Sequence, residues 1–177
     1  ALPILFKNRF VIIINRNRVF KYIFSSYFCY KIKMVVKMKI DIVCTTKSKY
    51  IKCVADEMAR WVKTYVHDLK DYHENECVDL LVIGFDDTLF EDKELLNFIQ
   101  SLNRQKVKNV ALINCFYINN KQLMKVIKLC QDQQLPLMRE QYTFKMSFDQ
   151  RKEINPLIID NARLYIEDMV NVIRNYY

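Results

Sequence analysis

The sequence predicts an α/β fold in which helices cover a parallel sheet, and two observations carry this prediction. From Met38 onward, short segments with strand character alternate with longer segments whose apolar residues recur every three to four positions. Such alternation is typical of parallel sheets with helices packed on their faces. In addition, the run Val78–Gly84 is almost entirely apolar, which is typical of a buried strand. The 177 residues, 51% of them hydrophobic, are enough for one substantial core.

The expected elements follow one another along residues 38–177. The five strands are expected at Lys39–Cys44, Thr64–His67, Val78–Gly84, Lys108–Asn114 and Leu137–Phe144. Four helices are expected around the apolar faces Ile51–Val62, Leu95–Leu102, Leu123–Cys130 and Ala162–Ile173. The acidic pair Glu91-Asp92 suits the N-terminus of the second helix, and Asn155 with Pro156 suits the N-cap and first turn of the last one. The segment Asp68–Glu76 is too short and polar for a full helix, so we expect a loop or a single turn there.

The first 37 residues differ in kind from the rest of the chain. They carry eight basic residues and no acidic one, whereas residues 38–177 carry 20 basic and 20 acidic residues. The formal net charge of +8 therefore belongs to this N-terminal arm, and the body has no overall electrostatic reason to bind nucleic acid or a membrane. The longest apolar run of the arm, Phe10–Ile14, is far too short for a membrane span. We interpret the arm as translated upstream sequence, with the native chain starting at Met34 or Met38.

The cysteines and histidines favour neither a metal site nor a disulfide framework. No pair of cysteines forms a C-x-x-C motif, and the two histidines lack a thiol or carboxylate cluster at ligand spacing. We therefore expect no metal, and mostly buried cysteines in the reducing environment of the cytoplasm. The six cysteines are Cys29, Cys44, Cys53, Cys77, Cys115 and Cys130.

The loop after the first strand is a candidate phosphate site. The loops after the first, third and fourth strands should converge on one edge of the sheet, where open α/β folds bind ligands. The first of these loops, Thr45–Tyr50, offers hydroxyls and backbone N–H groups before a helix, a combination that favours an anion. In the alternative interpretation, Ser48 only caps the helix while Lys47 and Lys49 face water. A single glycine, Gly84, stands where the buried third strand should end, and Gly-rich phosphate loops are excluded.

These residues resemble the flavodoxin family, whose first loop reads [ST]-x-[ST]-G-x-[ST] and is followed two residues later by Val-Ala. With Val54 and Ala55 as the anchor, Thr46 and Ser48 fall on the first two hydroxyl positions, and Lys49 falls on the glycine. The resemblance extends through the third strand, the helix after it and the final helix, and covers nearly all of residues 38–177. It implies a three-layer α/β/α flavodoxin-like fold with a five-stranded parallel sheet in the order 2-1-3-4-5.

The resemblance also implies a cofactor, namely non-covalently bound FMN, with its phosphate in the first loop. The flavin ring would lie between aromatic residues of the loops after the third and fourth strands. Asp86 and Asp87, if close to the ring, would lower its reduction potential. The implied cofactor-binding residues are Thr46, Lys47, Ser48, Lys49, Tyr50, Asp87, Thr88, Leu89, Phe90, Cys115, Phe116 and Tyr117.

The function that this implies is FMN-dependent electron transfer, with a monomeric carrier that serves a partner oxidoreductase and does not itself transform a substrate. One alternative is a redox-inactive binding or scaffold protein that kept the fold and lost FMN. Another is a phosphotransfer subunit that uses Cys44 as a phosphocysteine, which requires a thiol of low pKa at a helix N-terminus. A cysteine phosphatase is excluded, because Tyr50 stands where that chemistry needs an arginine.

Overall fold

The computed structural model describes residues 4–6, 10–12, 38–45, 49–73, 76–87, 92–146 and 153–176. Contacts divide the chain into two units, Ala1–Lys37 and Met38–Tyr177. In the first unit, β1 (Ile4–Phe6) pairs with β2 (Phe10–Ile12) in antiparallel orientation. The interpretation of the arm as non-native sequence stays a prediction.

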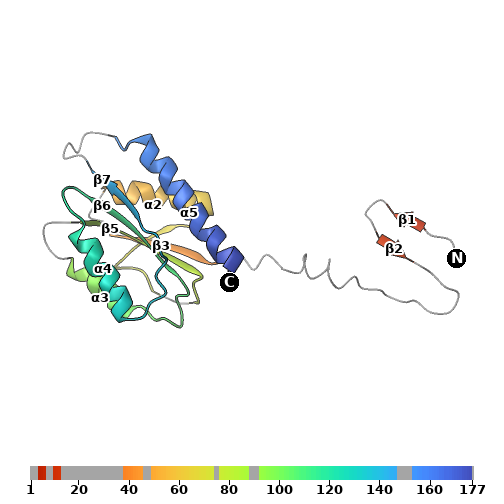
Figure 1. Ribbon diagram of the computed structural model, residues 1–177, viewed down its shortest axis with the longest axis horizontal. Coiled ribbons are helices and arrows are strands. Elements are labelled where there is room, and N and C mark those ends of the chain that lie inside the picture. The colour runs from red at the N-terminus through yellow and green to blue at the C-terminus, as the bar shows by residue number, and fades with distance from the viewer. Residues whose placement is uncertain are drawn as a thin grey trace. The chain divides into compact units, whose positions relative to one another are not determined.

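The second unit is a three-layer α/β/α domain (Figure 1). Its five strands are all parallel and lie in the order β4-β3-β5-β6-β7, which confirms the expected order 2-1-3-4-5. The strands are β3 (Ile40–Cys44), β4 (Val66–Asp68), β5 (Leu80–Asp87), β6 (Val110–Phe116) and β7 (Tyr142–Lys145). Helices α2 (Lys49–Val62) and α5 (Pro156–Tyr176) cover one face, and α3 (Lys93–Ser101) and α4 (Lys121–Asp132) cover the other. No helix in the described part of the chain is long and apolar enough to cross a membrane.

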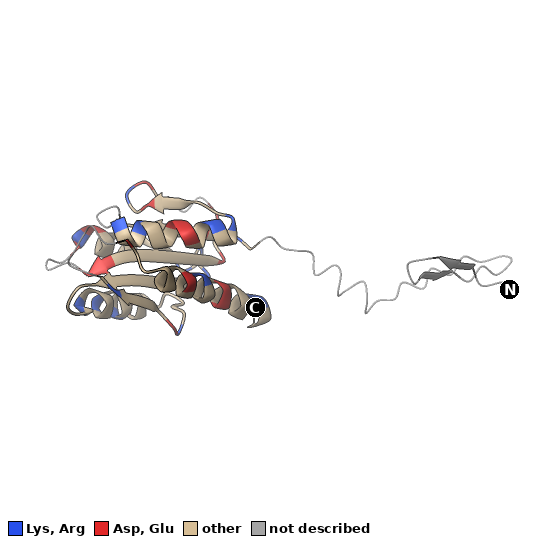
Figure 2. Cartoon of the chain, turned by 90° about the horizontal axis from the view of Figure 1, so that it is seen from above, with Lys and Arg blue, Asp and Glu red and all other residues tan. Residues whose placement is uncertain are grey.

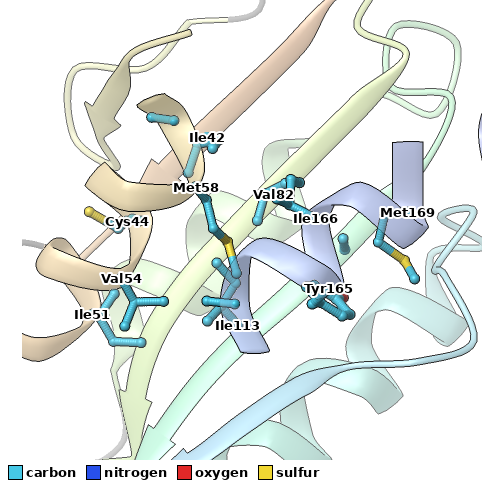
Figure 3. Close-up of a cluster of buried hydrophobic side chains, with 14 of the residues drawn as sticks. Ile42, Cys44, Ile51, Val54, Met58, Val82, Ile113, Tyr165, Ile166 and Met169 are labelled. Atoms are coloured by element: carbon cyan, nitrogen blue, oxygen red, sulfur yellow. The ribbon is translucent and has the colours of Figure 1, made fainter. Parts of the chain in front are cut away.

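Two apolar clusters hold the layers together, one on each face of the sheet. Alternate residues of β5 point to opposite faces, so Leu80 and Val82 join the α2 and α5 cluster while Leu81 and Ile83 join the α3 and α4 cluster. All four side chains are fully buried. Burial on both faces explains why the strands are continuous apolar runs in the sequence. Figure 3 shows the first cluster, in which the helix residues meet those of the central strands.

The third strand does not end at Gly84 as expected, because β5 continues through Asp87. Gly84 pairs with Cys44, the last residue of β3, and it also pairs with Ile113 of β6. The next three residues of β5 then pair with β6 alone, up to Asp87 opposite Phe116. The sequence predicts a loop that begins after Gly84, because this glycine closes the apolar run; Asp86 and Asp87 follow it. Their carboxylates find partners at the sheet edge, so the strand tolerates them.

The other boundaries differ by a few residues, mainly at the fifth strand. Leu137 makes an isolated bridge with Val110, and the regular strand β7 begins only at Tyr142. Between them, the backbone carbonyl of Glu140 accepts a hydrogen bond from the hydroxyl of Tyr165. The helix starts agree with the sequence: the Asp92 carboxylate accepts from two backbone N–H groups of α3. The side chain of Asn155 accepts from the first turn of α5 in the same way.

Candidate functional site

The carboxyl edge of the sheet brings the ends of β3, β5 and β6 together, as expected for the parallel order. Thr45 directly follows β3, and its hydroxyl donates a hydrogen bond of 3.1 Å to a carboxylate oxygen of Asp86 on β5. Thr45 is buried and its backbone N–H donates to the carbonyl of Gly84. The first loop is therefore tied at its start to the neighbouring strand, and the Asp86 carboxylate stands at the sheet edge beside it.

Helix α2 begins at Lys49, the residue that falls on the family's glycine, and Tyr50 follows it. Among the described non-glycine residues, only Lys63 and Gln134 have a positive φ, so a lysine at position 49 costs no left-handed strain. The first turn of α2 contains no acidic residue. The positive charge of Lys49 is unfavourable next to the positive end of the helix dipole. An anion bound at this helix end would be stabilised by the charge of Lys49 and by the dipole. The N-terminus of α2 is thus a positively charged part of the carboxyl edge of the sheet.

Tyr117 lies just beyond β6 and is half-buried, close to the start of α2. Burial raises the pKa of its hydroxyl, and negative charge on Cys115, Tyr50 and Asp86 would raise that pKa further. Tyr50 and Tyr117 pack against the same buried cluster, and Asp86 pairs with Cys115 of that cluster, so the three side chains lie on the α2 and α5 face of the sheet. Two tyrosines and one carboxylate from three different elements therefore converge at this edge.

The side chain of Asp87 lies on the face of the sheet that α3 and α4 cover, opposite to the face on which Tyr50 and Tyr117 pack. Its carboxylate accepts a 2.9 Å hydrogen bond from the backbone N–H of Gln122 in the first turn of α4, and it also interacts with the N–H of Leu123. Asn120, the residue at the N-cap position, makes no side-chain hydrogen bond to the helix. Burial raises the pKa of Asp87, although these two backbone bonds act to lower it. The carboxylate of Asp87 thus caps α4, and a contact between this residue and FMN stays a prediction.

Cys115 and Phe116 belong to strand β6 and not to the loop that the sequence suggested. Cys115 is fully buried in the cluster beneath α2 and α5, so its side chain is withdrawn from the edge. Phe116 is the last residue of the strand and is half-buried. The Cys115 side chain is therefore a core residue, and its role in binding the cofactor stays a prediction.

Half of the expected contacts cannot be located, because they lie outside the described residues. These are Thr46, Lys47 and Ser48 of the first loop and Thr88, Leu89 and Phe90 after β5. The remaining expected contacts in the described part, Lys49, Tyr50, Phe116 and Tyr117, all lie at the carboxyl edge. A cavity of about 180 Å³ adjoins Tyr50 on the side of β7 and α5. Its walls are Tyr50, Phe144, Lys145, Met146, Glu153, Ile154, Asn155 and Ile158.

Cys44 does not meet the requirement of phosphocysteine chemistry. The side chain is buried, and burial together with the carboxylates of Asp56 and Asp68 raises the pKa of the thiol to about 11. A nucleophilic cysteine needs the opposite shift. Cys44 is a small core residue, which counts against the alternative of a phosphotransfer subunit; that alternative stays a prediction that thiol reactivity can test.

Sequence reasoning missed the polar residues at the start of α4. Gln122 is buried, and its side-chain nitrogen has no hydrogen-bond partner in the described part of the protein; the same is true of the side-chain oxygens of Asn114 and Asn120. The only available signal was the density of amides in Asn119-Asn120-Lys121-Gln122, which also suits an ordinary loop. The described residues contain no group of three or more His, Cys, Asp or Glu side chains that could hold a metal ion.

Comparison with known proteins agrees with the topology. No family model and no curated protein sequence matches this chain. Among solved structures, a flavodoxin from the domain Archaea matches 77% of this chain and 99% of its own, with a TM-score of 0.55 and 10% identity. Oxidised flavodoxin 1 from Bacillus cereus matches 75% of this chain and 97% of its own, with a TM-score of 0.59 and 12% identity.

A third similar structure is the rubredoxin oxygen:oxidoreductase from Desulfovibrio gigas, with a TM-score of 0.64 and 8% identity. It covers 77% of this chain, which in turn spans only 36% of that larger protein. Residues 38–177 therefore form a domain with the flavodoxin-like α/β fold. Because the sequence identities are only 8–12%, the similarity supports the fold alone.

Proposed function

We propose that the domain Met38–Tyr177 is an FMN-binding electron carrier of flavodoxin type that serves a partner oxidoreductase. The observation that carries the proposal is that Tyr50, Asp86 and Tyr117 share one face of the sheet at its carboxyl edge, with Tyr50 in the first turn of α2. An edge of this kind is where open α/β sheets bind ligands. The flavodoxins among the similar structures support the choice of FMN.

The residues present fit the two ends of FMN in charge and chemistry. The phosphate is an anion, and the N-terminus of α2 carries the positive end of the helix dipole, the charge of Lys49 and no acid in its first turn. The flavin is a flat aromatic ring, and Tyr117 offers an aromatic surface in the half-buried position that such a ring needs. When bound, FMN would supply one- and two-electron chemistry. The chain itself would bind the phosphate, orient the ring and place Asp86 near it.

Asp86 gives the proposed carrier a means of tuning its cofactor. Its carboxylate accepts a hydrogen bond from the hydroxyl of Thr45 and lies on the same face of the sheet as Tyr117. A fixed negative charge disfavours added negative charge on a nearby ring, so Asp86 would lower the reduction potential of bound FMN. The Asp86→Asn variant should therefore bind FMN and have a higher potential than the wild type.

The test is a titration of FMN with the full chain, followed by quenching of flavin fluorescence. The expected result is saturable quenching at one FMN per chain, weakened about tenfold or more by Tyr117→Ala. The matched control is Tyr65→Ala, because Tyr65 is 81% exposed and precedes β4 at the opposite edge of the sheet. Absence of quenching at high protein concentration would reject the proposal.

The second candidate is a redox-inactive binding or scaffold protein that has kept the fold. One observation favours it: Asp87 and Cys115, two of the contacts implied by the family resemblance, are used inside the protein as a helix cap and a core residue. This candidate predicts a folded domain that FMN does not stabilise. Thermal unfolding with and without FMN separates it from the carrier, because a ligand that binds only the folded state raises the melting temperature.

A further inference from the structure

The charges of the domain are unevenly distributed between its two helical layers. Helices α3 and α4 together carry four basic residues, Lys93, Lys121, Lys125 and Lys128, and two acidic ones, Glu94 and Asp132. Helices α2 and α5 of the other layer together carry five basic and five acidic residues. Figure 2 marks these charges along the chain, with Lys and Arg in blue and Asp and Glu in red.

The acids of the α2 and α5 layer neutralise its bases directly. Arg163 of α5 pairs with Glu57 of α2 at 2.9 Å, and Arg60 pairs with the same carboxylate group at 2.6 Å. Arg163 also contacts Asp160 at 3.4 Å. This layer therefore has little net charge to offer a partner.

Helix α4 has a cationic outer face. Lys121, Lys125 and Lys128 stand at positions i, i+4 and i+7, so they share one side of the helix, and all three are exposed. Like charges at this spacing destabilise a helix, and a lysine in the first turn also opposes the helix dipole. The Asp87 carboxylate interacts with Lys121 and Lys125, but it is buried and already bonded to the helix backbone. Asp132, four residues after Lys128, is the one acid of α4, so the helix keeps a net positive charge that is complementary to an acidic partner.

Two exposed apolar side chains accompany these lysines. Ile118, in the loop between β6 and α4, is 70% exposed, and Met124, in the first turns of α4, is 65% exposed. Ile118 directly follows Tyr117 of the candidate cofactor site. Apolar residues surrounded by charged ones are the usual anatomy of a protein–protein interface, in which burial gives affinity and charge guides approach.

We propose that this α4 face, made of Ile118, Lys121, Met124, Lys125 and Lys128, docks an acidic redox partner protein beside the candidate cofactor site. The proposal rests on the proposed function and adds the charge and the position of the partner. Three lysines are fewer than the roughly four to eight clustered basic residues that recognise anionic membranes. Exposed apolar side chains also suit a protein surface better than a phosphate backbone, whose recognition rests mainly on basic side chains.

The experiment titrates the ¹⁵N-labelled full chain with an acidic plastocyanin in its Cu(I) form, which is diamagnetic and needs no flavin. The expected result is a set of amide shifts confined to residues 117–128 that disappears at high salt. The triple variant Lys121→Gln, Lys125→Gln, Lys128→Gln should weaken binding about tenfold or more. The control variant Lys52→Gln, Lys63→Gln removes two exposed charges of α2 and its C-terminal end and should bind as the wild type does.

Equal binding of a basic cytochrome c to the same residues would overturn the proposal, as would unchanged binding by the triple variant or shifts on another face. Shifts on α4 with anionic lipid vesicles or duplex DNA, and none with plastocyanin, would overturn it in favour of those ligands. Because the titration contains no FMN, its outcome is independent of flavin binding. Failure of docking and failure of the proposed function are thus observed separately.

Discussion

A β-carbon added to Gly84 would lie 3.0 Å from the Cγ2 methyl of Ile51 and 3.3 Å from the β-carbon of Cys44. Gly84 is the only glycine of the chain, and it has no positive φ. Its role is therefore steric: the missing side chain lets the first turn of α2 pack directly on β5. This contact sets how closely the cationic start of α2 approaches the carboxyl edge of the sheet.

Gly84→Ala should lower the free energy of unfolding by about 1–3 kcal/mol, the usual cost of overpacking a buried site. Ile51→Leu moves the branch point away from the β-carbon, so the double variant should recover part of this loss. The measurement is urea unfolding of the two single variants and the double variant. Strictly additive effects of the two substitutions would contradict the direct contact.

Asp87 offers a test of the cap on α4. Asp87→Ala leaves the backbone N–H groups of Gln122 and Leu123 without their acceptor, so we expect a loss of about 1–2 kcal/mol in unfolding free energy. Asp87→Asn keeps an acceptor and removes the charge. Comparable losses in both variants would show that the carboxylate charge matters more than the hydrogen bond.

The same residue predicts a pH dependence. Burial raises the pKa of Asp87 above its ordinary value of 3.8, so the folded protein holds this proton more tightly than the unfolded chain does. Its contribution to stability is fully present below pH 3.8 and is lost as pH rises through the raised pKa. Asp87→Asn should therefore gain stability relative to the wild type as pH rises through this range. Unfolding curves from pH 3 to pH 7 measure the difference, and a constant difference would contradict the raised pKa.

The sequence predicted the helices and their starts well because these depend on local signals, whereas the sheet order followed from the resemblance to the flavodoxin family. Apolar periodicity is strong in α2 and α5, and Asp92 and Asn155 are capping residues whose role depends only on the next few residues. The candidate site was harder to predict, because it depends on where a strand stops. The sequence predicted Asp86 and Asp87 to lie in a loop. In the structure they belong to β5, because they pair with β6 and their carboxylates accept hydrogen bonds from residues distant in the sequence.

The cysteines should differ in their reaction with iodoacetamide at pH 8. Cys44 and Cys130 are buried, and burial raises the pKa of each thiol to about 11, so both should remain unmodified in the folded protein. Cys53 and Cys77 are exposed and should react first. Peptide mapping by mass spectrometry measures each site, and protein unfolded in urea provides the control in which all four react. Rapid modification of Cys44 in the folded protein would favour the phosphocysteine alternative.

Lys49 should affect stability and FMN binding in opposite directions. Lys49→Glu places an acid at the N-terminus of α2, where the helix dipole favours negative charge, so unfolding free energy should rise by about 0.3–1 kcal/mol. The same carboxylate would repel the phosphate of FMN, so affinity measured by fluorescence quenching should fall. Lys63→Glu is the matched control, since it makes the same charge change just beyond the other end of α2. Lys63→Glu should leave the affinity for FMN unchanged. If Lys49→Glu raised the stability without lowering the affinity for FMN, the phosphate would not bind at the N-terminus of α2.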